Sequence, residues 1–306
     1  MRSDFFLKAI ASDHSSARSP AEYMKQDLSR GGGREGNPTP CAEGGVRSKG
    51  LFKSSKLANP LVSIIIAVFN GAQHLEPAIR SVLDQRYENI ELIIVDGGSQ
   101  DESTMIIRKY EDRLDYWASA PDHGIYDAMN KGISLAKGDW LLFLGSDDRL
   151  ISPDVIRQCM DSEFCLPTAD QKQCPALIYG DVIYTNGFYF RSQLNFWLLL
   201  HNTIHHQAAM YNHTLFDSFR YDTTLRSMAD YELNLLIYTR KYRTAYLGRP
   251  ISICHFGGQS SSLARRRQNI HELDTIRQRH IPYPIHVCMS AIVHAKTFVR
   301  LSLPWQ

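Results

Sequence analysis

Short uncharged runs alternate with amphipathic segments through the middle of the chain. The runs Val62 to Phe69 and Ile90 to Val95 are rich in β-branched residues and bounded by turn-forming residues, as expected for strands buried on both faces. Between them, residues 72–85 repeat apolar side chains at helical spacing, so one face of that helix can cover a sheet. The pattern predicts a strand, a covering helix and a second strand.

The alternation of strand and helix continues to residue 161. Residues 125–136 form a well-marked helix, because Ile125, Met129 and Ile133 are four apart on one face. This order is typical of an α/β fold with a mainly parallel sheet. We also predict helices at residues 101–110, 153–161 and 229–240, and strands at residues 115–118, 139–144, 176–185, 188–191 and 205–211.

Carboxylates follow two of the predicted strands, where each strand ends. The strand at residues 139–144 leads into Gly145-Ser146-Asp147-Asp148, and the strand at residues 90–95 leads into Asp96-Gly97-Gly98-Ser99. In a parallel sheet, ligands bind at the edge formed by these carboxyl ends. A pair of adjacent carboxylates can hold a hard divalent cation and, through it, a diphosphate. The sequence therefore predicts nucleotide-dependent transfer chemistry.

Composition limits the classes of protein that are possible. The 306 residues are 43% hydrophobic and 22% charged, as in an ordinary globular protein. Because 34 basic residues nearly balance 32 acidic ones, no global field attracts nucleic acid, and we expect no such partner. The six cysteines show no paired CxxC spacing, which argues against zinc. Reduced thiols and a cytoplasmic location are expected.

The two ends of the chain differ from its middle. Residues 1–58 contain breakers such as Gly31-Gly32-Gly33 and are interpreted as a mobile extension. Phe5-Phe6-Leu7 is too short for a secretory signal, which argues against export. No stretch reaches the roughly 18 apolar residues that span a bilayer. Residues 263–306 are interpreted as a helical carboxy-terminal segment.

Several motifs in order resemble those of the family 2 glycosyltransferases, which are inverting enzymes of the GT-A fold. The likeness extends from Pro60 to Ser262 and is to single-domain bacterial enzymes of surface polysaccharide assembly. It implies one GT-A domain at residues 59–262. The motifs are Ala67-Val68-Phe69-Asn70-Gly71, Val95 to Asp101, Pro121 to Gly132, Gly145 to Asp148, His206-Gln207, Ala229 to Leu233 and Phe256 to Ser260.

The resemblance also implies roles for residues that bind the donor. The loop after the first strand and the acid that ends the second would hold the base and ribose of a nucleotide sugar. Asp148 would bind Mg²⁺ or Mn²⁺, and Asp147 would lie beside it near the ribose. Because Gly145 and Ser146 replace part of the fuller Asp-x-Asp pattern, the diphosphate and water would supply most of the metal ligands. The donor-binding residues implied are Ala67, Phe69, Asn70, Asp96, Asp122, Lys131 and Asp147.

Inverting transfer needs a base that takes the proton of the acceptor hydroxyl. Asp230 matches the family's catalytic acid, and Glu232 is the runner-up. A structural alternative is that Ser227 and Asp230 form a capping box at the start of a helix. His205 and His206 would face opposite sides of a strand, with His206 placed near the sugar by the family match.

The substrates and partners are less sharply predicted. We expect a UDP-sugar, with a GDP-sugar as the alternative, and a saccharide or lipid-linked saccharide acceptor. Arg265-Arg266-Arg267, followed by Ile270, Leu273 and Ile276, predicts an amphipathic helix. We hypothesise that this end of the chain, with Val293 to Leu303, helps the protein rest on anionic lipid at the inner face of the plasma membrane.

Two other functions stay open at the level of the sequence. A sugar-1-phosphate nucleotidyltransferase should carry a basic, glycine-rich loop after its first strand, whereas Phe69-Asn70-Gly71-Ala72-Gln73 has no lysine or arginine. A non-catalytic sugar-binding protein is the second alternative. Loss of nucleotide-sugar hydrolysis in Asp148→Ala would argue against it.

Overall fold

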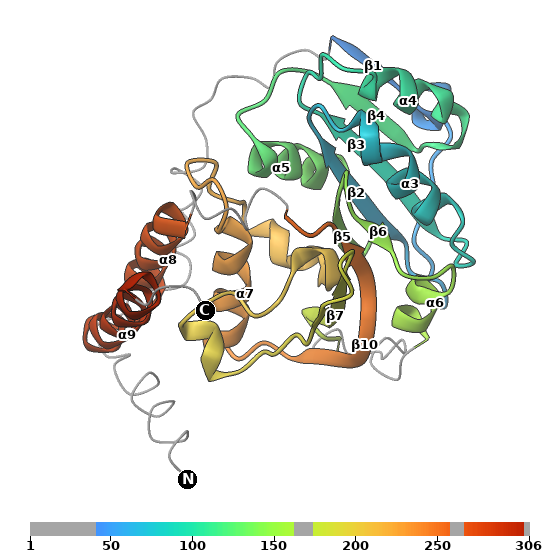
Figure 1. Ribbon diagram of the computed structural model, residues 1–306. Helices are drawn as coiled ribbons and strands as arrows, with labels where there is room; N and C mark the ends of the chain where they lie inside the picture. The colour runs from blue at the N-terminus through green and yellow to red at the C-terminus, as the bar shows by residue number, and fades with distance from the viewer. Residues whose placement is uncertain (1–40, 162–173, 258–265, 303–306) are drawn as a thin grey trace.

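The computed structural model describes residues 41–161, 174–257 and 266–302. The strands are β1 (Ala42–Gly44), β2 (Val62–Val68), β3 (Ile90–Asp96), β4 (Tyr116–Ser119), β5 (Trp140–Gly145), β6 (Arg149–Leu150), β7 (Leu177–Tyr184), β8 (Tyr189–Phe190), β9 (Ala209–Asn212) and β10 (Thr244–Cys254). The α-helices are α3 (Ala72–Leu83), α4 (Ser103–Lys109), α5 (Ile125–Leu135), α6 (Val155–Met160), α7 (Ala229–Thr239), α8 (Arg266–His280) and α9 (Tyr283–Ser302). These strands form a single sheet (Figure 1).

The first half of the sheet confirms the predicted α/β architecture. Strands β4, β3, β2 and β5 are parallel neighbours, and β2 lies between β3 and β5. Helices α3 and α4 cover one face, and α5 covers the other (Figure 1). Within α5, Met129 and Ile133 are buried as predicted, but Ile125 is exposed and Tyr126 takes the inward position.

The second half of the sheet is mixed. Strand β9 is antiparallel to β5 and β7, whereas β10 is parallel to β7 and antiparallel to β6. The sequence did not predict β10, because Gly248-Arg249-Pro250 interrupts its apolar pattern where its register with β7 shifts. The predicted strand at residues 205–211 begins only at Ala209, since His206–Ala208 form a short 3-10 helix.

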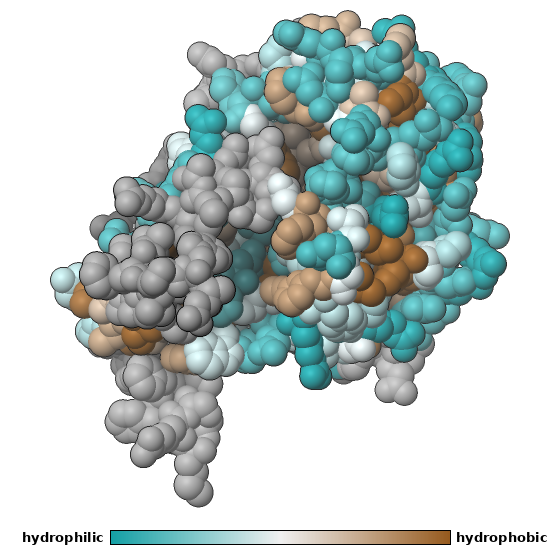
Figure 2. All heavy atoms as spheres, in the orientation of Figure 1, coloured by the Kyte–Doolittle hydropathy of each residue, from teal (hydrophilic) through white to brown (hydrophobic). Residues whose placement is uncertain are grey.

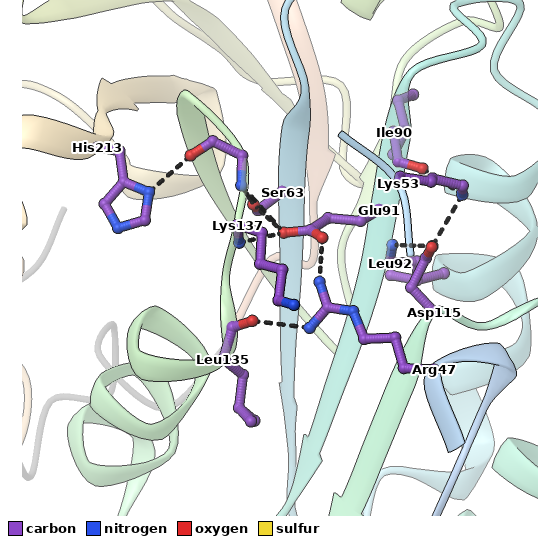
Figure 3. Close-up of polar contacts among 11 residues, drawn as sticks. Arg47, Lys53, Ser63, Ile90, Glu91, Leu92, Asp115, Leu135, Lys137 and His213 are labelled. Carbon is purple, nitrogen blue, oxygen red and sulfur yellow. Dashed lines mark hydrogen bonds and ion pairs between the residues drawn. The ribbon is translucent and has the colours of Figure 1, made fainter. Parts of the chain in front are cut away.

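Part of the predicted mobile extension belongs to the fold. Strand β1 pairs with β4, and a 3-10 helix follows at Val46–Lys49, so the boundary at residue 58 is wrong for this part. Residues 1–40 lie outside the described residues. The Arg47 guanidinium binds the carboxylate of Glu91 and the carbonyl oxygen of Leu135 (Figure 3). Lys53 binds the buried Asp115 carboxylate at 2.9 Å.

Glu91 is fully buried at the amino end of the parallel strands. Besides Arg47, its carboxylate accepts bonds from the Ser63 hydroxyl and from the backbone N–H groups of Lys137 and Gly138 (Figure 3). A buried charge with one ionic partner and three further donors is compensated. We call Arg47 and Glu91 the amino-end ion pair.

The carboxy-terminal helices pack on the domain. Leu273 and Ile276 of α8 are buried in the same hydrophobic cluster as Leu233 and Ile237 of α7. The apolar face that was predicted to meet lipid is therefore a core face in this helix. Arg265 lies outside the described residues. Within the described ranges, no helix is long and apolar enough to cross a bilayer.

The visible surface is mostly hydrophilic. Its hydrophobic residues gather in small patches rather than over one continuous area (Figure 2). At the opposite end of the parallel strands from the amino-end ion pair, three loops meet and carry the predicted site residues.

Candidate functional site

The adjacent carboxylates lie in a tight turn directly after β5. The N–H of Asp148 donates to the carbonyl oxygen of Gly145 at 3.1 Å, and a Cβ on Gly145 would meet an Asp148 oxygen at 2.5 Å. Asp148 is buried, whereas Asp147 is partly exposed. The close approach explains why glycine ends this strand.

Two distant segments hold the Asp148 side chain. Its Oδ1 accepts a bond from the backbone N–H of His255 at 2.9 Å, and its Oδ2 accepts one from the Gln207 amide at 2.9 Å. Burial raises the pKa of Asp148, and the Asp147 carboxylate raises it further, while these two bonds lower it. Among the described residues, no lysine or arginine forms an ion pair with either aspartate.

This donor set fits a hard divalent cation. Two carboxylates repel each other here, and the Gln207 Oε1 atom is buried without a hydrogen-bond partner. Oxygen atoms of this kind are the preferred ligands of Mg²⁺ and Mn²⁺. The described residues contain no group of three or more His, Cys, Asp or Glu that could hold a metal. Any such ion would take further ligands from substrate and water.

The loops after β2 and β3 are bonded to each other. The Asn70 N–H donates to the Ser99 hydroxyl at 2.8 Å, and the Asn70 side-chain oxygen accepts from the N–H of Gln100 at 2.9 Å. Asn70 has a φ of 49°, a left-handed conformation that asparagine tolerates. Phe69 beside it is 62% exposed, and Ala67 is partly buried at the end of β2. The exposed Phe69 ring therefore lies beside two loops that hold each other in place at the carboxyl ends of β2 and β3.

Asp96 holds the β3 loop from inside. It is 1% exposed and accepts bonds from the N–H groups of Gly98 and Ser99 and from the hydroxyls of Ser99 and Ser119. The carboxylate therefore shapes this loop, with little surface left for a ligand.

Asp122 is the more accessible acid next to that loop. A Cβ on Gly97 would lie 2.6 Å from its Oδ2, and its Oδ1 accepts the N–H of Gly124 at 2.9 Å. Burial raises the pKa of Asp122, while the Gly124 bond and the charge of Lys131 lower it. Lys131 itself pairs with Asp127 at 3.2 Å, one turn away on α5. The structure thus brings Asp122 to Asp96 and turns Lys131 toward Asp127.

Asp230 is buried at the start of α7 and is bound by three side chains. Its Oδ1 accepts from the Tyr126 hydroxyl at 3.3 Å, and its Oδ2 accepts from the Asn202 amide at 3.0 Å. The His206 Nδ1 atom lies 3.2 Å from the same Oδ2. Burial raises the pKa of Tyr126 well above its usual value, and the Asp230 charge adds to the rise, so this phenol stays a neutral donor.

The capping-box interpretation of Asp230 is wrong. Met228 is the N-cap of α7, no side chain caps the helix locally, and the Ser227 hydroxyl is buried without a hydrogen-bond partner. Glu232 points away from Asp230, because its carboxylate contacts His280 at 2.6 Å and Arg279 at 3.5 Å on α8. The runner-up base is thereby placed at the interface between two helices.

The two histidines do face different surroundings, although they are not in a strand. The His205 ring bonds to the Tyr184 hydroxyl at 3.0 Å and lies edge-on to Phe190. Burial lowers the pKa of His205 to about 4, so it is neutral near pH 7. His206 contacts Asp230, and the next residue, Gln207, contacts Asp148.

This short segment is the link between the two sides of the site. Because His206 and Gln207 are consecutive, Asp148 and Asp230 are brought to one region although 82 positions separate them in the chain. Asn202, Gln207 and Tyr126 were not predicted as site residues. Gln207 and Tyr126 do fall within two of the family motifs, His206-Gln207 and Pro121 to Gly132, whereas Asn202 falls in none. Of the other quoted glycines, Gly257 is exposed and Gly258 lies outside the described residues.

Interlocked loops and acids at the carboxyl ends of parallel strands in a mixed sheet, joined to a buried acid on a helix, form the arrangement expected of a GT-A glycosyltransferase. The family model described as glycosyl transferase family 2 matches residues 63–162. A PGL/p-HBAD biosynthesis glycosyltransferase of Mycobacterium tuberculosis is 33% identical over 215 residues, which are 68% of this chain and 82% of that protein. The chain belongs to glycosyltransferase family 2.

Other known proteins agree with this assignment. An uncharacterized glycosyltransferase of Mycobacterium tuberculosis is 45% identical over 104 residues, 34% of this chain and 40% of that protein. Residues 1–349 of Staphylococcus aureus TarS, solved with UDP-GlcNAc, match with a TM-score of 0.58 at 16% identity, over 78% and 73% of the two chains. The mannosyltransferase PcManGT of Pyrobaculum calidifontis, solved with GDP-Man and Mn²⁺, matches with a TM-score of 0.53 at 17% identity, over 98% and 82%. These likenesses confirm the GT-A fold.

Proposed function

We propose that this glycosyltransferase is an inverting enzyme that moves a sugar from a nucleotide-sugar donor to a hydroxyl group of a saccharide or lipid-linked saccharide, in cell-surface glycan assembly. The observation that carries the proposal is the bonding chain from Asp148 through Gln207 and His206 to Asp230. It brings an acid suited to the leaving group next to an acid suited to the acceptor.

The donor would lie over the carboxyl ends of β2, β3 and β5. Phe69 offers an exposed ring to the base, and Asn70 fixes the loop that carries it. Asp96 builds the neighbouring loop, and Asp122 offers a carboxylate that can accept from a nucleobase N–H. A UDP-sugar is favoured and a GDP-sugar is the alternative, since solved neighbours of this fold bind both kinds of nucleotide.

Asp148, with Asp147 and the side-chain amide oxygen of Gln207, would hold Mg²⁺ or Mn²⁺. The ion would supply positive charge to the departing diphosphate. Asp230 takes the proton of the attacking hydroxyl as its oxygen bonds to the anomeric carbon, and the bond from that carbon to the diphosphate oxygen breaks with both electrons leaving on phosphate. Tyr126 and Asn202 hold the Asp230 carboxylate in place for this step.

The proposal also includes the location of the enzyme in the cell and its contact with the membrane. We place the enzyme in the cytoplasm, with its acceptor at the inner face of the membrane. Because Leu273 and Ile276 of α8 and Ile285 and Met289 of α9 are core residues, the proposed contact with lipid is left to Val293 to Leu303. A deletion from residue 283 onward that left binding to anionic liposomes unchanged would contradict this contact.

The proposal is tested by incubating the protein with UDP-glucose, UDP-GlcNAc or GDP-mannose and Mn²⁺ and measuring release of the nucleoside diphosphate. We expect release from at least one donor, with loss in Asp148→Asn and Asp230→Asn. Proton NMR of the sugar product should give the anomeric configuration opposite to that of the donor. Retained configuration, or release that neither substitution affects, would contradict the proposal.

A further inference from the structure

The helix that carries Asp230 begins without a cap of its own. An α-helix leaves its first N–H groups without partners in the helix, and polar groups usually bind them. Met228, the N-cap of α7, has no polar side chain. The Ser227 hydroxyl is buried beside it and bonds to nothing in the described residues. The first turn of α7 therefore depends on groups from elsewhere in the chain.

Glu272 of α8 supplies such a group for the N-cap Met228 and also binds the two residues before it. Its Oε1 accepts the backbone N–H of Arg226 at 3.0 Å, and its Oε2 accepts the N–H groups of Ser227 at 2.9 Å and Met228 at 3.1 Å. Glu272 is 5% exposed, and Gln268 one turn earlier donates to Oε1 at 3.0 Å. The carboxylate lies at the positive end of the helix dipole, where negative charge is stabilising.

We propose that Glu272 is a positioning residue for the transfer reaction, acting through Asp230. Asp230 is only two residues after Met228, so the peptide groups that Glu272 binds lead directly into the turn that carries the base. Tyr126, Asn202 and His206 fix the side chain of Asp230. Glu272 fixes the backbone that leads into it. This inference rests on the proposed role of Asp230.

The main test is a double-mutant cycle of Glu272→Gln and Asp230→Asn, with nucleoside diphosphate release from the best donor as readout. Glu272→Gln keeps the side-chain shape but turns an amide donor toward N–H donors. We expect kcat to fall by about tenfold to a hundredfold, the scale of a small misplacement of a catalytic group, with donor KM unchanged. On the Asp230→Asn background, Glu272→Gln should cause almost no further loss, because both act on one step.

His280→Gln is the matched control. It alters another contact between α8 and α7, the one with Glu232 at 2.6 Å, but leaves Glu272 and its three bonds to residues 226–228 in place. We expect kcat to stay within about threefold of wild type, the range of additivity between independent sites. Hydrogen exchange should be faster in residues 226–231 of Glu272→Gln and unchanged in the rest of α7.

Three results would overturn the inference: an unchanged kcat in Glu272→Gln, an equal loss on both backgrounds, or a loss of donor binding together with kcat. If Glu272→Ala does not fold, Glu272→Gln and the exchange measurement still decide. Failure of the proposed function is distinguishable, because wild type would then release no nucleoside diphosphate or Asp230→Asn would release it normally.

Discussion

Glu91 and Asp148 are both buried carboxylates, and they lie at opposite ends of the same set of parallel strands. Glu91, at the amino end, has a guanidinium partner and three further donors. Asp148, at the carboxyl end, has two neutral donors and a second carboxylate beside it. The protein compensates one charge fully and leaves the other short of positive charge.

The difference separates stability from function. A buried carboxylate with an ionic partner is compensated, and loss of that partner leaves a costly charge. A buried carboxylate without an ionic partner has a raised pKa and offers oxygen atoms that a divalent cation from outside the fold can bind. Substitutions at the two ends should therefore have opposite effects on stability and on activity.

The largest effect is expected for Asp230→Asn, which removes the proposed base. Nucleoside diphosphate release with acceptor or water should fall on the order of a thousandfold, the usual contribution of general base catalysis. Thermal shifts produced by UDP or GDP with Mn²⁺ should be unchanged, because Asp230 is not part of the donor loops. A normal rate in this variant would remove Asp230 from the mechanism.

Asp148→Asn should lower metal-dependent activity by about 3 kcal/mol of transition-state stabilisation, roughly a hundredfold. The apo Asp148→Asn protein should nevertheless be as stable as wild type or more stable. The folded state binds the Asp148 proton more tightly than the unfolded chain, so stability is lost as pH rises from the ordinary value of 3.8 through the raised pKa. Asparagine removes that loss at neutral pH, and the unpaired Gln207 oxygen can accept its new N–H group.

The measurement for this variant is thermal unfolding at pH 7 with and without Mn²⁺ and nucleotide. We expect an equal or higher midpoint for apo Asp148→Asn than for apo wild type, and a metal-dependent rise only in wild type. A lower midpoint in the variant would mean that Asp148 serves the fold in the way that Glu91 does.

Arg47→Met tests the amino end. Removing the cation leaves Glu91 buried and uncompensated, which should lower the free energy of unfolding by about 3 to 5 kcal/mol. The rate per folded molecule should stay as in wild type. Urea unfolding measures the first quantity. The double variant Arg47→Met, Glu91→Gln carries neither charge and should recover much of the loss; no recovery would show that packing, rather than charge, sets the effect.

The smallest effect is expected for His205→Gln. Burial lowers the pKa of His205 from 6.5 to about 4, so the unfolded chain binds this proton more tightly. Stability contributed by the neutral ring is then present above pH 6.5 and is lost as pH falls toward 4. The variant should show a shallower acid decline of its unfolding midpoint, and its activity should follow the same pH profile as wild type above pH 6.5.

The amino-terminal half of the fold could be predicted because its strands are fully buried, so each is a continuous apolar run that stops at a turn. The same rule located Asp96 and Asp148, which end strands. β10 was missed because a bulge with Gly248 and Pro250 breaks the run.

The rest of the site depends on contacts that no local pattern encodes. Asp230 could be matched to a family motif, but Asn202 and Tyr126, its partners, are 28 and 104 positions away. The same holds for Glu272, which is 44 positions from Met228. The spacing of Ser227 and Asp230 left a capping box open as an alternative, whereas in the structure a carboxylate from another helix binds the backbone just before α7.

The most direct test of the account is the position of the cation. Crystals of the protein grown with UDP and Mn²⁺, or with GDP and Mn²⁺, should give an anomalous manganese peak at about 2.2 Å from an Asp148 carboxylate oxygen, between it and the diphosphate. The nucleotide should lie over the carboxyl ends of β2 and β3. Manganese bound away from Asp148, or a nucleotide bound elsewhere on the protein, would contradict the account.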